Sequence, residues 1–203
     1  VLNEVGRGWP VSGQLDLATW MSYRLGMRMA WGAASGPEFG NLVLTRFRIR
    51  ASEVVTLTHW DDYQGRSLLD VTVDLGFGRA ISVLGTHLQH RNTPEALTAR
   101  MAEIGEILAH WAGAPATVLA GDLNPMQGEP GQGPRVPGEF VEIEALLDAG
   151  FATAGNLEAC DPPTSNENCS DFILVSGDLT MRSLDVGVNF ADHRILVADV
   201  VVP

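Results

Sequence analysis

The stretch Val118-Leu119-Ala120-Gly121-Asp122-Leu123-Asn124 decides the fold. Its apolar first half predicts a short buried strand, and Gly121-Asp122 ends that strand in a turn with polar side chains. Other apolar runs are flanked by acidic residues or histidines in the same way, at Leu2-Asn3-Glu4-Val5, Leu84-Gly85-Thr86-His87-Leu88, Asp171-Phe172-Ile173-Leu174-Val175 and Ala191-Asp192-His193. Because polar side chains at strand ends can converge on one rim of a sheet, we expect them to form a shared site.

The order of the other elements points to a layered fold. Strands are expected over 41–44, 67–75, 80–85, 117–120, 172–175 and 195–202. Helices are expected over 16–25, from Thr93-Pro94 onward and over 139–149. The second helix has an apolar stripe formed by Leu97, Met101, Ile104, Leu108 and Trp111. This mixture favours an α+β or layered α/β sandwich over a doubly wound sheet, in one domain over 1–203.

The length, composition and charge of the chain limit the classes of protein to which it can belong. The 203 residues are enough for a sizeable hydrophobic core, and no run of apolar residues is long enough to span a bilayer. The net charge is -12, with 25 acidic against 13 basic residues. Nucleic-acid binders usually carry a basic surface, so the acidity argues against a DNA substrate without excluding it. If DNA were the substrate, the candidates to grip it are Arg46, Arg48, Arg50, His90, Arg91 and Arg135, with Trp31 and Trp60 as candidate stacking platforms.

The two cysteines, Cys160 and Cys169, flank a loop-like segment over 161–168. A disulfide that closes this loop would indicate an oxidising compartment. The alternative is two free thiols, because spacing alone does not reveal geometry.

The polar residue types suit hydrolysis of a phosphoester. Magnesium and calcium prefer the hard oxygen ligands that Asp and Glu supply, and a bound cation polarises a phosphoryl oxygen. A histidine oriented by a carboxylate can take a proton from water. Taken singly, each residue has a plainer interpretation: His87 as a structural histidine, Asp122 as a turn cap, Glu4 as a surface acid.

Together and in this order, the segments resemble the endonuclease/exonuclease/phosphatase superfamily, which includes DNase I-like nucleases and inositol polyphosphate 5-phosphatases. The matching segments are Asn3-Glu4-Val5, Gly40-Asn41-Leu42-Val43-Leu44-Thr45-Arg46, Thr86-His87-Leu88, Gly121-Asp122-Leu123-Asn124, Asp171-Phe172-Ile173-Leu174-Val175-Ser176 and Ala191-Asp192-His193. The resemblance implies a DNase I-like four-layer sandwich of two packed mixed β-sheets flanked by helices. It also implies a phosphodiesterase, phosphatase or nuclease that uses Mg²⁺, with Mn²⁺ or Ca²⁺ as alternatives.

The resemblance also implies a role for each site residue. Glu4 would be the principal metal ligand and Asp192 a second one. Asp122 would position or activate the water, and His193 would be the general base or bind phosphate, oriented by Asp171. Asn124 would hold a phosphoryl oxygen, and His87 would contact the phosphate or support the leaving group. Asn41 would line the substrate pocket.

Two features depart from the superfamily pattern. The upstream strand that usually carries a metal-site Asn is absent from the sequence, and Ser170 stands where relatives often have Arg. The alternative to an enzyme is therefore a catalytically weak or inactive domain of the same fold that recognises a phosphorylated lipid or sugar.

A narrower resemblance lies in Gly6-Arg7-Gly8-Trp9-Pro10, Gly13 and 16–27. These segments are similar to a bacterial subgroup whose domain follows a membrane region. From it we expect a monomeric, extracytoplasmic domain attached to an N-terminal membrane region. The expected substrate is a small or lipid-linked phosphoester rather than DNA.

Overall fold

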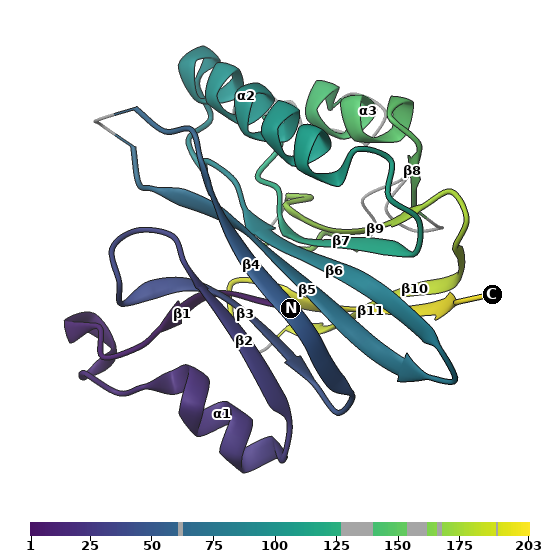
Figure 1. Ribbon diagram of the computed structural model, residues 1–203. Helices are drawn as coiled ribbons and strands as arrows, with labels where there is room; N and C mark the ends of the chain where they lie inside the picture. Colours follow the sequence, from purple (N-terminus) through teal and green to yellow (C-terminus); the bar gives the residue numbers. More distant parts are fainter. Residues whose placement is uncertain (61–62, 127–139, 154–161, 166–167, 190) are drawn as a thin grey trace. The chain divides into compact units, whose positions relative to one another are not determined.

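The computed structural model describes residues 1–60, 63–126, 140–153, 162–165, 168–189 and 191–203 (Figure 1). The chain forms two compact units, which are described separately. Unit 1 consists of Val1–His87 with Thr117–Gly121, and unit 2 of Leu88–Ala116 with Asp122–Pro203. The single domain expected over 1–203 stays a prediction. In the part of the chain that the structure describes, no helix is both long and apolar enough to cross a membrane.

Unit 1 is built from two sheets that share a core. In the first, β1 (Leu2–Gly6), β3 (Phe39–Thr45) and β2 (Arg28–Ala33) are antiparallel, in the order β1-β3-β2. In the second, β4 (Arg48–Leu57), β5 (Arg66–Gly76), β6 (Arg79–His87) and β7 (Thr117–Asp122) are neighbours in that order. Side chains from both sheets pack together at Ala30, Val43, Leu69, Val71 and Val73. The two sheets therefore bury their apolar faces against each other.

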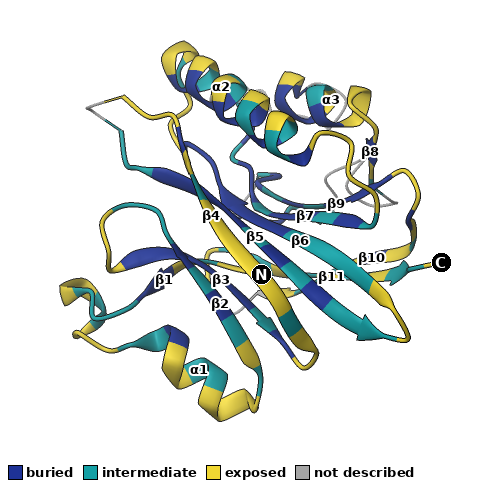
Figure 2. Ribbon diagram, in the orientation of Figure 1, coloured by how far each residue is buried: buried dark blue, intermediate teal, exposed yellow. Residues whose placement is uncertain are grey.

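One helix covers the outer side of the first sheet. The 3₁₀ turn η1 (Pro10–Ser12) precedes α1 (Leu17–Leu25), and Asp16 caps α1 by accepting a 2.9 Å hydrogen bond from the Thr19 N–H. Ala18 packs against Val5 and Leu42, while most of the helix surface remains exposed (Figure 2). The predicted helix over 16–25 and its cap are confirmed.

Unit 2 contains α2 (Pro94–Trp111) and α3 (Val141–Asp148), which pack against each other. Strand β8 (Phe151–Ala152) pairs with β9 (Asp171–Ser176), and β10 (Thr180–Asn189) pairs with β11 (Arg194–Val201), both antiparallel. Thr93 caps α2 by accepting a hydrogen bond from the Ala96 N–H, as its Thr-Pro sequence predicts.

The expected apolar stripe of α2 was wrong in part, and strands β2, β4 and β10 were not predicted. The buried face of α2 includes Arg100 and Glu103, whereas Leu97, Met101 and Leu108 are only partly buried. The buried face of α2 is therefore rotated relative to the predicted stripe. The prediction did not include Arg100 in this face, because its charge is neutralised inside the unit by Glu142, at 2.9 Å. Strand β4 was not predicted, because most of its residues are exposed on both faces and its sequence does not alternate between apolar and polar.

Candidate functional site

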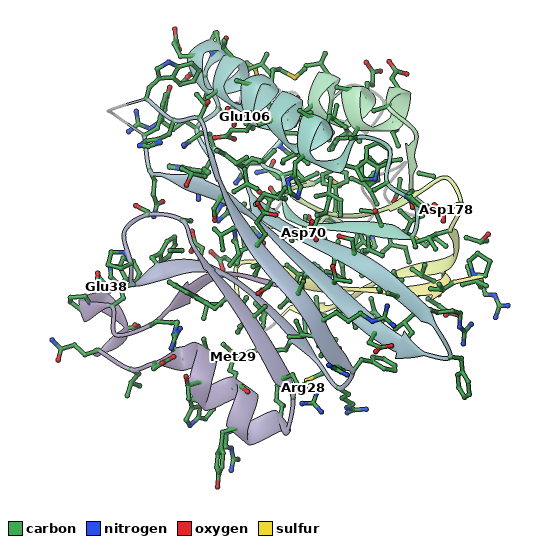
Figure 3. The ribbon with its side chains drawn as sticks, viewed as in Figure 1. Arg28, Met29, Glu38, Asp70, Glu106 and Asp178 are labelled. Carbon is green, nitrogen blue, oxygen red and sulfur yellow. The ribbon has the colours of Figure 1, made fainter. Side chains whose placement is uncertain are left out.

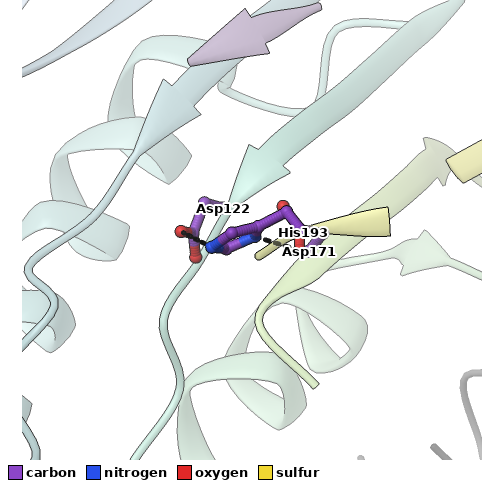
Figure 4. Close-up of side chains that lie close together, drawn as sticks. All are labelled: Asp122, Asp171 and His193. Atoms are coloured by element: carbon purple, nitrogen blue, oxygen red, sulfur yellow. Dashed lines mark hydrogen bonds and ion pairs between the residues drawn. The ribbon is translucent and has the colours of Figure 1, made fainter. Parts of the chain in front are cut away.

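Three predicted site residues meet in unit 2. The imidazole of His193 lies between the carboxylates of Asp171 and Asp122 (Figure 4). His193 Nδ1 is 2.8 Å from Asp171 Oδ2, and His193 Nε2 is 3.9 Å from Asp122 Oδ2. Asp122 is buried, while His193 and Asp171 are partly exposed. The imidazole is therefore held at Nδ1 by Asp171, while its Nε2 faces Asp122.

Backbone hydrogen bonds place Asp122 and Asn124. The Leu88 N–H donates to the Asp122 carbonyl at 2.9 Å, and the Leu123 N–H donates to the Ser170 carbonyl at 2.8 Å. The Asp122 carboxylate accepts a 3.0 Å hydrogen bond from the Asn124 N–H. Asn124 has a positive φ of 43°, which is uncommon for a residue other than glycine. Asparagine tolerates this left-handed conformation better than most residues, so it suits the turn after β7.

A second loop, part of the loop-like segment expected over 161–168, positions Asp171 and His193, a role that was not predicted. The Thr164 hydroxyl is fully buried and accepts hydrogen bonds from the Ser170 and Asp171 N–H groups at 2.9 and 3.0 Å. Ser165 forms a bridge with His193, and its Oγ lies 3.3 Å from His193 Nε2. The only signal in the sequence was the turn-forming Pro162-Pro163 before these two hydroxyl residues.

The acidic surroundings favour the protonated form of His193. The hydrogen bond to Asp171 is the main cause, followed by the charges of Asp171, Asp122 and Asp192, and together they raise the pKa of His193 to about 9. Burial opposes this rise only in part. The ring therefore carries a positive charge at neutral pH in the metal-free protein.

The same three residues could instead hold a metal ion. One ligand atom from each of Asp122, Asp171 and His193 can be chosen so that all lie within 4.8 Å of one another. A metal bound through His193 would have to displace the proton that Asp171 stabilises. The 2.8 Å contact between Asp171 and His193 resembles the carboxylate–histidine pairs that orient an imidazole.

Two further predicted residues lie together in unit 1. Glu4 Oε1 is 3.9 Å from His87 Nδ1; the Glu4 side chain is 61% exposed, and that of His87 is buried. Glu4 has a positive φ of 57° and lies where the pairing of β1 with β3 is irregular. This bulge turns a carboxylate out of the strand toward solvent, which is a common use of bulges near active sites.

Asn41 is buried between strands of unit 1. Its side-chain oxygen accepts a 2.8 Å hydrogen bond from Asn3 Nδ2, and its Nδ2 donates to the Ser67 carbonyl at 3.0 Å. Asn3 Nδ2 also donates to the Thr86 carbonyl at 2.9 Å. Asn41 therefore ties β1 to β3 and β5. The predicted contact of Asn41 with substrate stays a prediction.

Gly121 is needed for close packing beside His87. A Cβ at this position would clash with the carbonyl group of Thr86 on the neighbouring β6. The glycine also has a φ of 153°. Its lack of a side chain lets β7 approach β6 directly before the predicted catalytic histidine.

Asp192 is exposed and adds to the negative potential at His193. Its predicted role as a metal ligand stays a prediction. Cys169 is fully buried. Cys160 lies outside the described residues, so its predicted pairing with Cys169 also stays a prediction.

No protein-family model matches the sequence, and no curated protein matches it. Several solved structures do match this chain. An endonuclease/exonuclease/phosphatase protein from Beutenbergia cavernae has a TM-score of 0.76 and 20% identity over 98% of this chain. The chain has the endonuclease/exonuclease/phosphatase fold. The α/β sandwich predicted from the sequence is thereby confirmed.

Two other structures share this fold. The human Nocturnin catalytic domain has a TM-score of 0.66 and 20% identity, over 89% of this chain and 74% of that one. A Neisseria 3′ phosphatase bound to a product DNA hairpin has a TM-score of 0.64 and 16% identity, over 90% and 82%. The chain spans only 61% of the length of the Beutenbergia protein.

Proposed function

We propose that this chain is a divalent-metal-dependent phosphoesterase that hydrolyses its substrate by attack of water at phosphorus. The observation that carries the proposal is the Asp171–His193–Asp122 arrangement, with Nδ1 of His193 fixed at 2.8 Å and Nε2 facing Asp122. A domain that only binds phosphate needs a positive charge, but it does not need a histidine held between two carboxylates.

The geometry supports a distinct role for each member of this group. His193, charged and held by Asp171, binds a phosphoryl oxygen and stabilises the negative charge that builds up there. Asp122 faces the same space, and it orients the water and accepts its proton. As the oxygen–phosphorus bond forms, the bond to the leaving group breaks. Asn124, next to Asp122, donates to a second phosphoryl oxygen.

The donor chemistry of the predicted metal ligands suits a hard cation. Glu4 and Asp192 are both exposed carboxylates, and Mg²⁺ keeps several waters while it binds one or two carboxylates. The bulge at Glu4 leaves its oxygens open to solvent. We propose that Glu4 and Asp192 are each ligands for a divalent cation, Mg²⁺ or, in its place, Mn²⁺ or Ca²⁺. When bound, the cation neutralises charge on the phosphate.

For the substrate we propose a small or lipid-linked phosphoester in preference to DNA, acted on by a monomeric domain. The net charge of -12 supports this choice, because DNA binding rests largely on contacts between basic residues and phosphates. We retain from the sequence the proposal of an extracytoplasmic domain attached to a membrane region.

Hydrolysis assays test the proposal directly. Wild type is compared with His193→Ala on bis-para-nitrophenyl phosphate, a phosphoinositide panel and an abasic DNA duplex, with Mg²⁺, Mn²⁺ or Ca²⁺ and with chelator. His59→Ala is the matched control, because His59 is exposed and is not one of the predicted site residues. Turnover should require metal and be lost only in His193→Ala.

Two results would overturn the proposal. Equal turnover by His193→Ala and wild type would remove the catalytic assignment. Binding of inorganic phosphate or a lipid headgroup without turnover, under any of the three metals, would favour the alternative of a binding domain.

A further inference from the structure

Strand pairing brings three turns to one end of unit 1. Arg28 at the start of β2 pairs with Thr45 at the end of β3, and β4 begins three residues later. Arg48 pairs with Asp74, close to the hairpin that joins β5 and β6. The end of α1 leads directly into β2, so residues 23–28, 46–50 and 76–79 lie at this end, here called the tip. Figure 3 labels Arg28 at the tip and Glu38 at the opposite end.

The tip exposes large apolar side chains on separate turns. The side chains of Tyr23 and Phe77 are 86% and 99% exposed, and those of Leu25 and Phe47 are 58% and 52% exposed. Scattered exposed apolar residues are ordinary, but a group of them on adjacent turns indicates an interaction surface.

Phe77 is strained as well as exposed. It is the first residue of the two-residue turn between Gly76 and Arg79, with a φ of 53°, and the next residue, Gly78, has a φ of 81°. A hairpin turn with two positive φ values favours Asn, Asp or Gly at its first position. Because almost all of the ring faces solvent, packing within the chain does not explain a phenylalanine there.

Arginines surround these apolar side chains. The three segments of the tip contain six exposed arginines and no acidic residue: Arg24, Arg28, Arg46, Arg48, Arg50 and Arg79. Arg50 pairs with Asp74 just outside the tip. The chain as a whole has a net charge of -12, so this concentration of positive charge is a local property.

We propose that the tip docks on the surface of an anionic phospholipid bilayer. Arginines pair with lipid phosphates, while aromatic and aliphatic side chains enter the interfacial region. A nucleic acid is the less suitable partner for this surface. Base stacking needs rings along a groove that follows the nucleic-acid strand, whereas these four apolar side chains lie at the end of α1 and in two turns between strands, and include a leucine.

Docking has a consequence for the proposed active site, and this consequence rests on the proposed function. Strand β6 starts at Arg79 in the tip and ends at His87, a span of about 26 Å for an extended strand. His87 and the neighbouring Glu4 then face the aqueous side. Docking through the tip therefore favours a small soluble phosphoester over a lipid in the same bilayer.

Vesicle sedimentation with the whole chain tests the proposal. Phosphatidylcholine vesicles with and without phosphatidylglycerol are the probes, at low and high salt. Wild type should bind only the anionic vesicles and should be released by salt. Phe47→Ser/Phe77→Ser should weaken binding about tenfold or more, because two rings no longer enter the interface. Arg46→Gln/Arg48→Gln should also weaken it.

The controls are Val11→Ser and Arg182→Gln, an exposed apolar residue and an exposed arginine that do not belong to the three segments of the tip. Both should bind like wild type, and circular dichroism should show that all variants are folded. The proposal would be overturned if wild type did not bind anionic vesicles, or if the controls lost as much vesicle binding as the tip variants. Tighter binding to DNA than to vesicles would also overturn it. Turnover of bis-para-nitrophenyl phosphate should be the same in wild type and in Phe47→Ser/Phe77→Ser, so failure of docking is distinguished from failure of catalysis.

Discussion

The two units carry their charges in different ways. Unit 1 has eight arginines and eight acidic residues, whereas unit 2 has five arginines and seventeen acidic residues and accounts for the whole net charge. Unit 2 buries Arg100 with Glu142 and holds His193 against Asp171. Unit 1 keeps Glu4 and the arginines of its tip exposed.

The two units thus differ in where these charges lie: the named charges of unit 2 pair within the chain, whereas those of unit 1 are exposed on its surface. A buried charge must be paired, because desolvation is costly, and its partner then fixes its position. An exposed charge is screened by water and contributes little to folding. The predictions below test this distinction, starting with the largest expected effect.

Asp171→Asn should lower turnover about 10²- to 10⁴-fold, because His193 loses the carboxylate that fixes and charges it. In NMR titrations of the metal-free protein, the pKa of His193 should fall from about 9. A pKa raised above the ordinary 6.5 stabilises the fold below pH 6.5, and this stability is lost as pH rises through about 9. An unchanged titration in the variant would contradict the proposed role of Asp171.

Arg100→Met should destabilise the protein by about 3–5 kcal/mol, measured by urea unfolding, because Glu142 is left buried without its partner. Arg100 also donates to the Gln89 and Arg91 carbonyls at 2.9 and 2.8 Å. Arg100→Met/Glu142→Leu should cost less than the sum of the two single changes. Strict additivity would show that the two side chains are not coupled.

Glu4→Gln should raise the Mg²⁺ concentration for half-maximal turnover about tenfold, because a ligand loses its charge. Its stability should match that of wild type, since the side chain is largely exposed. Glu53→Gln, on the exposed strand β4, is the matched control and should leave the metal requirement unchanged. A loss of stability in Glu4→Gln without a change in metal requirement would identify Glu4 as a structural residue.

Asp16→Asn should have the smallest effect, at most about 1 kcal/mol, because asparagine caps a helix as well as aspartate and the pair with Arg7 is on the surface. The hydrogen bonds from Arg7 lower the pKa of Asp16 to about 2. The stability from this depressed pKa is present above pH 3.8 and is lost as pH falls through about 2. Urea unfolding should show this loss in wild type and not in Asp16→Asn.

Much of the fold could be predicted from the sequence. Asp16 and Thr93 marked where α1 and α2 begin, because a capping side chain acts on the backbone within three residues of itself. Strand β4 could not be predicted, because an exposed strand lacks the alternation that burial imposes. The buried face of α2 was misjudged, because the partner that neutralises Arg100 lies on another helix.

The sequence by itself determined the residue types of the candidate site and the strand ends and turns where they occur. Only the tertiary structure decided which of them meet: His193 with Asp171 and Asp122 in unit 2, Glu4 with His87 in unit 1. It also decided that Thr164 holds Asp171 and that three distant turns form one arginine-rich tip. Turn and cap chemistry acts between neighbours in the chain, whereas distances between strand ends depend on how the whole sheet pairs.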